Sequence, residues 1–324
     1  MATVLKIAQT AAELDDVFRL RHQVYVIEDG KFGGVPLPGE RIVDQYDAMP
    51  GVANIIAYED GEAVGTLRIN RDVGQGLPSE EVYDFSKIIL ERTRQHDGPP
   101  VLASGSMLAI REGWRRRRDV IQALLKTAIG VGNAWNTTHV VATINHETVS
   151  LYTKLGFEIV DEPLWVEHIG NHVVPLVAQF EPVYQWAFGG LLHEKLDAFW
   201  LDNFSSRFER ILLSPGEQLF AQGQAGHHAY IVDNGWVTIS RRDEEGKELV
   251  LATLAAGALF GEVALLDEQP RSASAQAPTY AEVIRLERKD FLEITRDDQR
   301  LLGQLLRVFA QRIRATDELA MVMA

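Results

Sequence analysis

Cysteine is absent from this chain of 324 residues, and so are long apolar runs. Without cysteine the chain has no disulfides, no thiolate metal ligands and no cysteine nucleophile. No apolar stretch reaches the roughly 18 residues that a membrane-spanning helix requires. Residues 1–16 contain a single lysine and no apolar core, so they do not predict a secretion signal. We therefore expect a soluble, cytoplasmic protein.

Positive charge is also scarce, because 32 Lys and Arg residues face 46 Asp and Glu residues, for a net charge of −14. Nucleic-acid binding depends on neutralising phosphates, so this balance argues against a protein built to hold DNA or RNA. The nine histidines show no ligand spacing with carboxylates, and we predict no metal site. The adjacent His227 and His228 are expected on a solvated surface.

The pattern of elements changes once along the chain, which fits two domains of about 150 residues each. Up to about residue 180, predicted strands alternate with helices, including a helix over 11–29 and a hairpin around the turn at 59–62, which is typical of an α+β domain. A helix is predicted over 183–208. Short strands with glycine turns then fill 211–286, and a last helix covers 300–319. We predict domains at 1–182 and 183–324.

The segment from Phe260 to Ser274 has the residues of a small anion site inside the β-rich half. Gly261 opens a short helix whose backbone N–H groups attract an anion. Arg271 offers a charge-assisted hydrogen bond to the same anion, and Ser272 offers a hydroxyl. Glu262 is placed to accept hydrogen bonds from a sugar hydroxyl, so the segment predicts a small nucleotide. The alternative is a β-roll that binds nothing, with Arg271 in a surface ion pair.

Residues of about 185–320 resemble the cyclic-nucleotide-binding domains, through this segment and the patterns at 213–220 and 230–235. The resemblance implies a β-roll with terminal helices, in which Glu262 binds the ribose 2′-hydroxyl and Arg271 the cyclic phosphate. It further implies that the phosphate is lined by Gly261, Val263, Ala264, Ser272 and Ala273. Serine after the arginine resembles the bacterial catabolite activator, which favours cAMP, with cGMP as the alternative.

The last helix, over 300–319, has one apolar stripe. We expect this helix to close over the base as a lid. It is also a candidate homodimer contact. The activator family carries a helix-turn-helix after this domain. Too few residues follow here for such a motif, so we expect no DNA binding.

In the first half, residues 145–158 form a helix ended by Gly156, followed by a strand. Tyr152 on this helix is a candidate proton donor to a leaving group. The alternative is a half-buried tyrosine that only packs.

Residues 151–157 resemble the closing motif of the GNAT superfamily of N-acyltransferases, and the resemblance extends over roughly 5–180. It implies a mixed sheet with flanking helices and an acyl thioester donor, either acyl-CoA or acyl carrier protein. Tyr152 would protonate the departing thiolate. The donor would be bound by Leu108, Ala109, Ile110 and Asn145.

The predicted phosphate loop departs from that superfamily, since Asp119 and Ile121 stand where two glycines are usual. Asp119 with Gln122 predicts a capping box at the start of a helix. Basic residues before a helix oppose its dipole unless an anion binds there. We expect coenzyme A phosphates or an acidic acyl carrier protein at this loop, against the alternative of a solvated surface. The basic residues are Arg115, Arg116, Arg117 and Arg118.

Residues 21–25, 44–47 and 65–68 resemble the first half of the acyl-homoserine-lactone synthases and related N-acyl amino acid synthases, which pass long acyl chains to an amine. The matching residues, a predicted acceptor and acyl site, are Arg21, Asp44, Asp47 and Arg68. The alternative for these four is a structural ion-pair cluster. A glutamate and an arginine of the lactone synthases are missing from 104–107, so we expect acyl transfer to another amine.

The general base stays open among Asp47, Glu147 and His168. Together these features predict an N-acyltransferase governed by a cyclic nucleotide, a combination that resembles the mycobacterial cAMP-dependent lysine acetyltransferases. The acceptor is a protein lysine or a small amine. The alternative function is a non-catalytic sensor of two inputs, a cyclic nucleotide and an acyl thioester.

Overall fold

The computed structural model describes residues 2–32, 38–93, 99–167, 169–192, 209–243 and 245–323. The chain divides into two compact units, the first running from Thr3 through α5 (Phe180–Leu192) and the second starting at Ile211. The boundary expected near residue 182 falls within α5. The remainder of the helix predicted over 183–208 lies outside the described residues.

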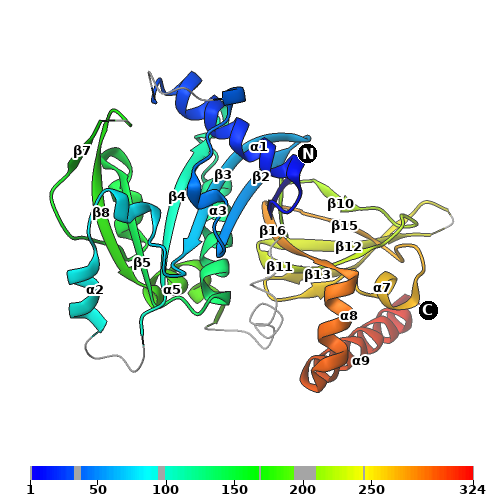
Figure 1. Ribbon diagram of the computed structural model, residues 1–324. Coiled ribbons are helices and arrows are strands. Elements are labelled where there is room, and N and C mark those ends of the chain that lie inside the picture. The colour runs from blue at the N-terminus through cyan, green and yellow to red at the C-terminus, as the bar shows by residue number, and fades with distance from the viewer. Residues whose placement is uncertain are drawn as a thin grey trace. The chain divides into compact units, whose positions relative to one another are not determined.

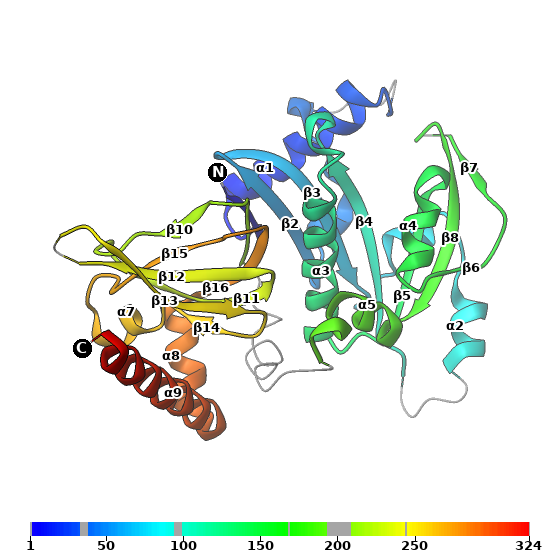
Figure 2. The same ribbon diagram turned by 180° about the vertical axis from the view of Figure 1, so that it is seen from behind.

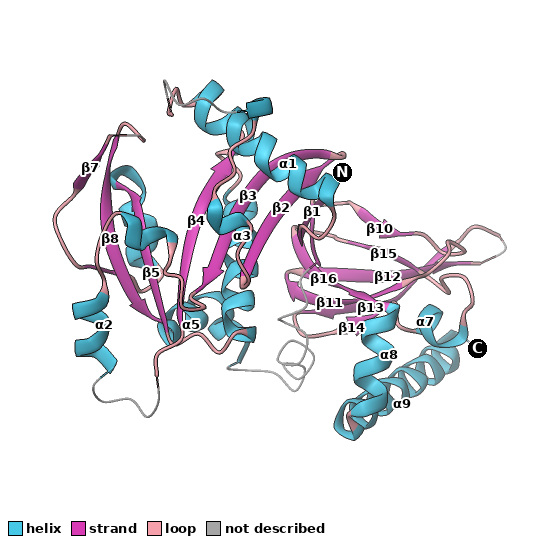
Figure 3. Ribbon diagram, in the orientation of Figure 1, coloured by secondary structure: helices cyan, strands magenta, loops and turns pink. Residues whose placement is uncertain are grey.

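A seven-stranded path, in the order β1-β2-β3-β4-β5-β8-β6, forms the sheet of the first unit, with β7 paired to β8 (Figure 3). Neighbours are antiparallel except β4 and β5, which are parallel. The strands are β1 (Thr3–Ile7), β2 (Val52–Glu59), β3 (Glu62–Arg71), β4 (Leu102–Ile110), β5 (His139–Asn145), β6 (Glu158–Ile159), β7 (Leu164–Val166) and β8 (Asn171–Gln179).

Helices cover both faces of this sheet (Figures 1 and 2). Figure 2 shows α3, α4 and α5 in front of the sheet, while α1 crosses behind it. The predicted helix over 11–29 is an α-helix to His22 and a π-helix, η1 (Gln23–Glu28), after it. The α-helix that ends at His22 is α1 (Ala11–His22). The unit also contains α2 (Ser86–Thr93), α3 (Arg118–Ala134) and α4 (Val149–Lys154). Its short 3₁₀ turns are η2 (Pro38–Glu40), η3 (Gln45–Asp47), η4 (Pro78–Glu81), η5 (Glu112–Trp114) and η6 (His146–Thr148).

Local chemistry explains several of these boundaries. Thr10 and Glu13 form a capping box that starts α1. Asp60 and Gly61 both have positive φ, the two-residue turn that joins twisted antiparallel strands, and the predicted hairpin of β2 and β3 is confirmed. Gly65 lets α3 approach the sheet, because a Cβ there would lie 2.9 Å from Ile110 Cδ1 and 3.1 Å from Leu124 Cδ1.

The second unit has two sheets, in the orders β14-β11-β16-β9 and β10-β15-β12-β13. Its strands are β9 (Glu209–Leu213), β10 (Gln218–Phe220), β11 (His228–Asn234), β12 (Trp236–Arg242), β13 (Glu248–Ala255), β14 (Leu259–Phe260), β15 (Ser274–Gln276) and β16 (Ala281–Glu287). Its helices are α7 (Val263–Asp267), α8 (Arg288–Asp297) and α9 (Gln299–Met323). The predicted fold class is confirmed: a mixed sheet with flanking helices, then a β-roll with terminal helices.

Candidate functional site

The predicted anion segment is a tight turn between β14 and the short helix α7. Gly261 has φ of +74°, a conformation that L side chains rarely adopt, and a Cβ there would lie 2.9 Å from Arg271 Nη1. Glu262 and Ala264 are buried beside it, whereas Val263 is partly exposed. The turn therefore brings the start of α7 against the side chain of Arg271, as the sequence predicts.

Arg271 is 4% exposed and makes its hydrogen bonds to main-chain carbonyls. Its Nη1 donates to Gly261 O at 2.5 Å and its Nη2 to His228 O at 2.7 Å. The guanidinium carbon lies 4.2 Å from the ring centroid of Phe220 and 5.6 Å from that of Tyr230, two rings that stack on each other. A buried cation held by rings and neutral carbonyls is suited to an anionic ligand.

Glu262 is completely buried with an incomplete set of partners. One carboxylate oxygen accepts from Arg312 Nη1 of α9, and the other has no hydrogen-bond partner among the described residues. Burial raises the pKa of Glu262 in spite of the nearby Arg312. The spare oxygen is suited to accept from a ligand hydroxyl.

The wall opposite α7 is closely packed. A Cβ on Gly226 would lie 2.6 Å from Ala264 Cβ and 2.9 Å from Arg271 Nε, so this position requires glycine. Ser272 is exposed and Ala273 is buried at the end of the segment.

Sequence reasoning missed Arg312 and the pair of rings under Arg271. Arg312 also donates to Leu259 O, so it ties α9 to the segment around α7. No local pattern pairs a basic residue of the last helix with a glutamate 50 positions earlier. The rings come from two strands, β10 and β11, and only the folded chain brings them under the guanidinium.

In the first unit, β4 leaves β5 in the middle of the sheet. The two strands pair in parallel only over Leu102–Ser104, and Figure 1 shows them separating beyond that point. Against β3 the register shifts after Ser106, and Met107 in the resulting bulge has φ of +55°. The backbone of Leu108–Ile110 therefore has no β5 partner. These are residues that the resemblance assigns to the donor, and donor binding stays a prediction.

Tyr152 lies on α4 and is 9% exposed. Its ring meets Phe157 edge-on at 5.5 Å, and Gly156 with φ of +97° ends the helix between them. Burial raises the pKa of Tyr152 to about 12, so its hydroxyl stays protonated at neutral pH. Asn145, the last residue of β5, leads into η6, and its carbonyl accepts from the Thr148 hydroxyl at 2.9 Å.

Of the four arginines at the start of α3, two have carboxylate partners and two do not. Arg115 Nη2 donates to Glu28 at 3.0 Å and to Asp29 at 2.8 Å. Arg116 and Arg118 are exposed and form no ion pair with any described residue. They leave free positive charge at the start of a helix, where an anion is favoured.

The capping box predicted for Asp119 is wrong. No side chain caps α3, which begins at Arg118. Arg117 forks onto the carboxylate of Asp119 instead, with Nη2 to Oδ2 at 2.7 Å. The predicted box is absent because Asp119 lies inside the first turn of α3, after the N-cap Arg117, and not at the N-cap itself.

The structure brings the four residues of the predicted acceptor site into one buried network, which we call the ionic cluster (Arg21, Asp44, Asp47 and Arg68). Arg21 Nη1 donates to both oxygens of Asp47, at 3.0 and 2.9 Å. Arg68 Nη2 donates to Asp44 at 2.9 Å, and its Nη1 lies 3.0 Å from Asp47. Both arginines thus have carboxylate counter-charges, while Arg21 Nε is buried without a hydrogen-bond partner among the described residues. Contact with an acceptor stays a prediction.

The candidates for general base differ in availability. Burial alone would raise the pKa of Asp47, but Arg21 and Arg68 outweigh it and lower the pKa, so Asp47 is a poor base. Backbone hydrogen bonding lowers the pKa of Glu147, which is exposed at η6. His168 lies outside the described residues.

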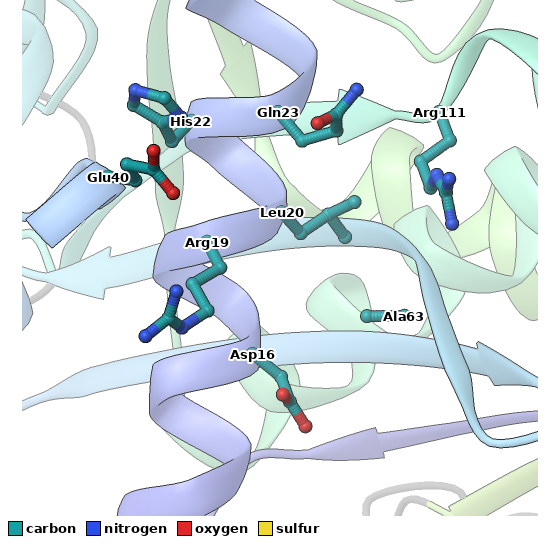
Figure 4. A pocket seen from close by; sticks show the side chains of 8 residues that line it. All are labelled: Asp16, Arg19, Leu20, His22, Gln23, Glu40, Ala63 and Arg111. Carbon is teal, nitrogen blue, oxygen red and sulfur yellow. The ribbon is translucent and has the colours of Figure 1, made fainter.

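Two hollows open on the first unit. One of about 300 Å³ lies beside α1, and Figure 4 shows Arg111 across it from Leu20 and Arg19. Its cations have partners, since Arg19 donates to Asp15 and Arg111 to Glu62. The other, of about 510 Å³, is mainly apolar and adjoins η6 and α4. It is lined by His146, Val149, Ile159, Val160, Asp161, Glu162, Pro163 and Val174.

Within the described ranges, no three histidine, aspartate or glutamate side chains gather as metal ligands. No helix of that part of the chain is long and apolar enough to cross a membrane.

Comparison with known proteins agrees with this division. The family described as N-acyl amino acid synthase FeeM matches residues 16–179, and the cyclic nucleotide-binding domain matches residues 210–298. The solved structure of FeeM from uncultured soil microbes superposes with a TM-score of 0.45 and 16% identity, over 55% of this chain and 91% of that one.

The curated relatives match the second unit. The cyclic AMP receptor protein of Thermus thermophilus is 38% identical over 130 residues, which are 40% of this chain and 58% of that protein. The cAMP-dependent protein kinase regulatory subunit of Yarrowia lipolytica is 38% identical over 95 residues, 29% of this chain and 23% of that protein. The chain thus spans little more than half the length of the first relative, and less of the second.

The synthase match covers half of the chain and places the first unit among N-acyltransferases. The second unit is a cyclic nucleotide-binding domain. The chain belongs to the N-acyl amino acid synthase FeeM family.

Proposed function

We propose that this protein transfers an acyl group from a thioester, carried by coenzyme A or by acyl carrier protein, to the amino group of an acceptor. The observation that carries the proposal is the separation of β4 from β5 at a strained bulge, beside the helix of Tyr152. Backbone groups of Leu108–Ile110 then bind the thioester arm as an added strand would. The family favours an amino acid as acceptor over a protein lysine.

In this reaction the acceptor nitrogen attacks the thioester carbonyl carbon, the C–S bond breaks and the sulfur leaves as a thiolate. Tyr152 donates its phenolic proton to that sulfur, because the raised pKa keeps the proton in place until the thiolate forms. The attacking nitrogen loses its own proton to a base, which stays open among Asp47, Glu147 and His168. The apolar hollow beside α4 has room for an apolar part of a substrate.

We further propose that cyclic nucleotide, preferentially cAMP, binds at Glu262 and Arg271 and controls the transfer. Relatives of the second unit are named for cAMP, and the serine after Arg271 resembles that of the bacterial catabolite activator. Arg312 of α9 donates to the carboxylate of Glu262. A ribose hydroxyl that binds this carboxylate would therefore change a contact of α9. Exposed Leu302, Leu306 and Ile313 on α9 support a homodimer through that helix. Both ligands fit the proposed cytoplasmic location.

The test incubates the purified full chain with acetyl-CoA or dodecanoyl-CoA and with each of the twenty protein amino acids or a lysine peptide. Release of free thiol that depends on the amine, with the acylated product found by mass, supports the transfer. Tyr152→Phe is expected to lower turnover by about 100- to 10,000-fold, the usual contribution of one acid–base group. Tyr58→Phe, which removes a hydroxyl bonded to Asp16, is the control and keeps full activity.

An acylated acyl carrier protein is the second donor arm. If no amine releases thiol from any donor, while thioester and cAMP both bind, the chain is the non-catalytic sensor of two inputs instead.

A further inference from the structure

A tyrosine that the proposed chemistry does not use is bonded to the bulge of β4. The hydroxyl of Tyr25 donates to Leu108 O at 2.8 Å, across 83 positions of sequence. Leu108 follows Met107, the residue with φ of +55°, at the point where the pairing of β4 with β3 shifts. The hydrogen bond therefore holds a peptide group of the segment that is proposed to bind the thioester.

Both ends of this hydrogen bond lie in uncommon backbone conformations. Tyr25 belongs to the π-helix η1, a form that is rare in proteins and frequent at functional sites. A methionine in the left-handed region costs free energy, and such residues persist only where their surroundings hold them. The two unusual segments meet through the phenolic hydroxyl.

We infer that Tyr25 is a positioning residue for the acyl transfer: its hydroxyl fixes the peptide group after Leu108 so that the bulged end of β4 presents its backbone to the thioester. The inference rests on the proposed function of this segment. Tyr25 itself contacts neither donor nor acceptor in this role.

The hydroxyl is the part of Tyr25 that matters. Burial raises the pKa of Tyr25, so the group remains a donor. The ring has contacts of its own, with its centroid 5.9 Å from that of Phe32 and 5.9 Å from Lys31 Nζ. Phenylalanine would keep those contacts and leave the Leu108 carbonyl without its donor. Because a partly buried carbonyl without a partner is unfavourable, the peptide group would turn toward another donor or toward water.

The first measurement compares Tyr25→Phe with Tyr58→Phe. Tyr58 is the matched control because its hydroxyl donates to Asp16 at 2.7 Å. That hydrogen bond also joins the sheet to a helix, here β2 to α1, and it does not involve β4. Displacement of about 1 Å at a reacting centre costs up to about 100-fold in rate. Tyr25→Phe should lower kcat by up to that factor at unchanged KM for the amine, and Tyr58→Phe should not. An unchanged kcat, an equal loss in both variants or an effect on KM alone overturns the inference.

The second measurement does not need turnover. Labelling with leucine ¹³C at the carbonyl and alanine ¹⁵N selects Leu–Ala peptide bonds, of which Leu108–Ala109 is one, assigned through Leu108→Ile. The Leu108 carbonyl resonance should move in Tyr25→Phe and stay in place in Tyr58→Phe, with melting temperatures equal between the variants. A resonance that does not move overturns the inference. Failure of the wild-type protein to acylate any amine would overturn the proposed function, while this resonance still decides the role of Tyr25.

Discussion

Both units bury arginines, but the hydrogen-bond partners of these arginines differ in charge. In the ionic cluster Arg21 and Arg68 are almost fully buried against the carboxylates of Asp47 and Asp44. In the second unit Arg271 is nearly as buried, yet its hydrogen bonds go to two neutral carbonyls. In the first arrangement each cation already has a carboxylate counter-charge, although Arg21 Nε lacks a hydrogen-bond partner among the described residues. In the second, Arg271 gains a directly bonded anion only when a ligand binds.

The buried carboxylates of the two units repeat the contrast. At Asp47 the charges of the arginines outweigh burial and lower the pKa. At Glu262 burial outweighs the charge of Arg312 and raises the pKa. A buried polar group is normally satisfied, so the spare oxygen of Glu262 is informative. Burial of charge alone therefore does not indicate a binding site. The second unit differs because a cation without a bonded carboxylate and a carboxylate with a spare oxygen occur in one segment.

The largest effect should come from Arg271→Glu. A second acid beside Glu262 would repel the cyclic phosphate and remove the cation that it needs, so calorimetry should detect no cAMP binding. Arg242→Glu, an exposed arginine on β12, is the control and should bind as the wild type does. Circular dichroism checks that both variants fold. If folded Arg271→Glu still bound cAMP, Arg271 would not be the residue that binds the cyclic phosphate.

Neutralising one buried carboxylate in each unit should separate stability from binding. Asp47→Asn leaves Arg21 and Arg68 short of a counter-charge and should cost about 3–5 kcal/mol in the free energy of unfolding. Glu262→Gln removes a charge whose burial is unfavourable, so it should cost less stability than Asp47→Asn and should lose cAMP binding. Urea unfolding measures the first effect and calorimetry the second. Asp44→Asn, partly exposed and paired with one arginine, should fall between them.

The pH dependence has opposite signs in the two units. Because the pKa of Asp47 is lowered by folding, its contribution to stability is present above its ordinary pKa of 3.8 and is lost as pH falls through the folded value. Because the pKa of Glu262 is raised, its contribution is full below its ordinary value of 4.5 and declines as pH rises through the folded one. Asp47→Asn should therefore flatten the acid side of the stability profile, and a profile unchanged by it would contradict the pairing.

The effect of one unit's ligand on the other unit's ligand affinity is expected to be smaller than the effects of these substitutions. A ligand shifts an equilibrium only through unequal affinity for two conformations, and couplings of about 1–3 kcal/mol correspond to about 5- to 150-fold. Binding of cAMP should change acyl-CoA affinity by such a factor, and acyl-CoA should change cAMP affinity equally. Arg312→Gln, which frees Glu262 from α9, should reduce the factor more than it reduces cAMP affinity. Identical affinities in every pairing would mean two independent modules.

Sequence patterns located the elements whose cause is local. The hairpin at Asp60-Gly61, the turn at Gly261 and the helix end at Gly156 are each set by one or two residues with positive φ. The two residue types that characterise the nucleotide segment, Glu262 and Arg271, are close in sequence and meet as expected. Periodicity and short motifs contain that information directly.

The errors and omissions concern partners that are distant in sequence or that compete locally. The sequence places Asp119 where it could cap the helix or pair with Arg117, and in the structure its carboxylate pairs with Arg117. Tyr25 and Arg312 find their partners 83 and 50 positions away, beyond the reach of any spacing rule. A cluster of charges looks the same in sequence whether its members satisfy one another or await a ligand, and only their partners in the fold distinguish the two.

The smallest predicted effect applies this rule to the loop before α3. Arg115 and Arg117 are bonded to carboxylates of the same unit, while Arg116 and Arg118 are exposed without such partners among the described residues. If incomplete pairing indicates function, the exposed pair should bind the donor's phosphates. Each charge at a helix start contributes about 0.3–1 kcal/mol, so Arg116→Glu with Arg118→Glu should weaken acyl-CoA binding by about tenfold, an effect that added salt diminishes. The matched double variant, Arg115→Glu with Arg117→Glu, should instead lower the melting temperature, because it places acids against Glu28 and Asp119. Calorimetry at low and high salt distinguishes the two, and an affinity for acyl-CoA that Arg116→Glu and Arg118→Glu leave unchanged at low salt would make the loop an ordinary solvated surface.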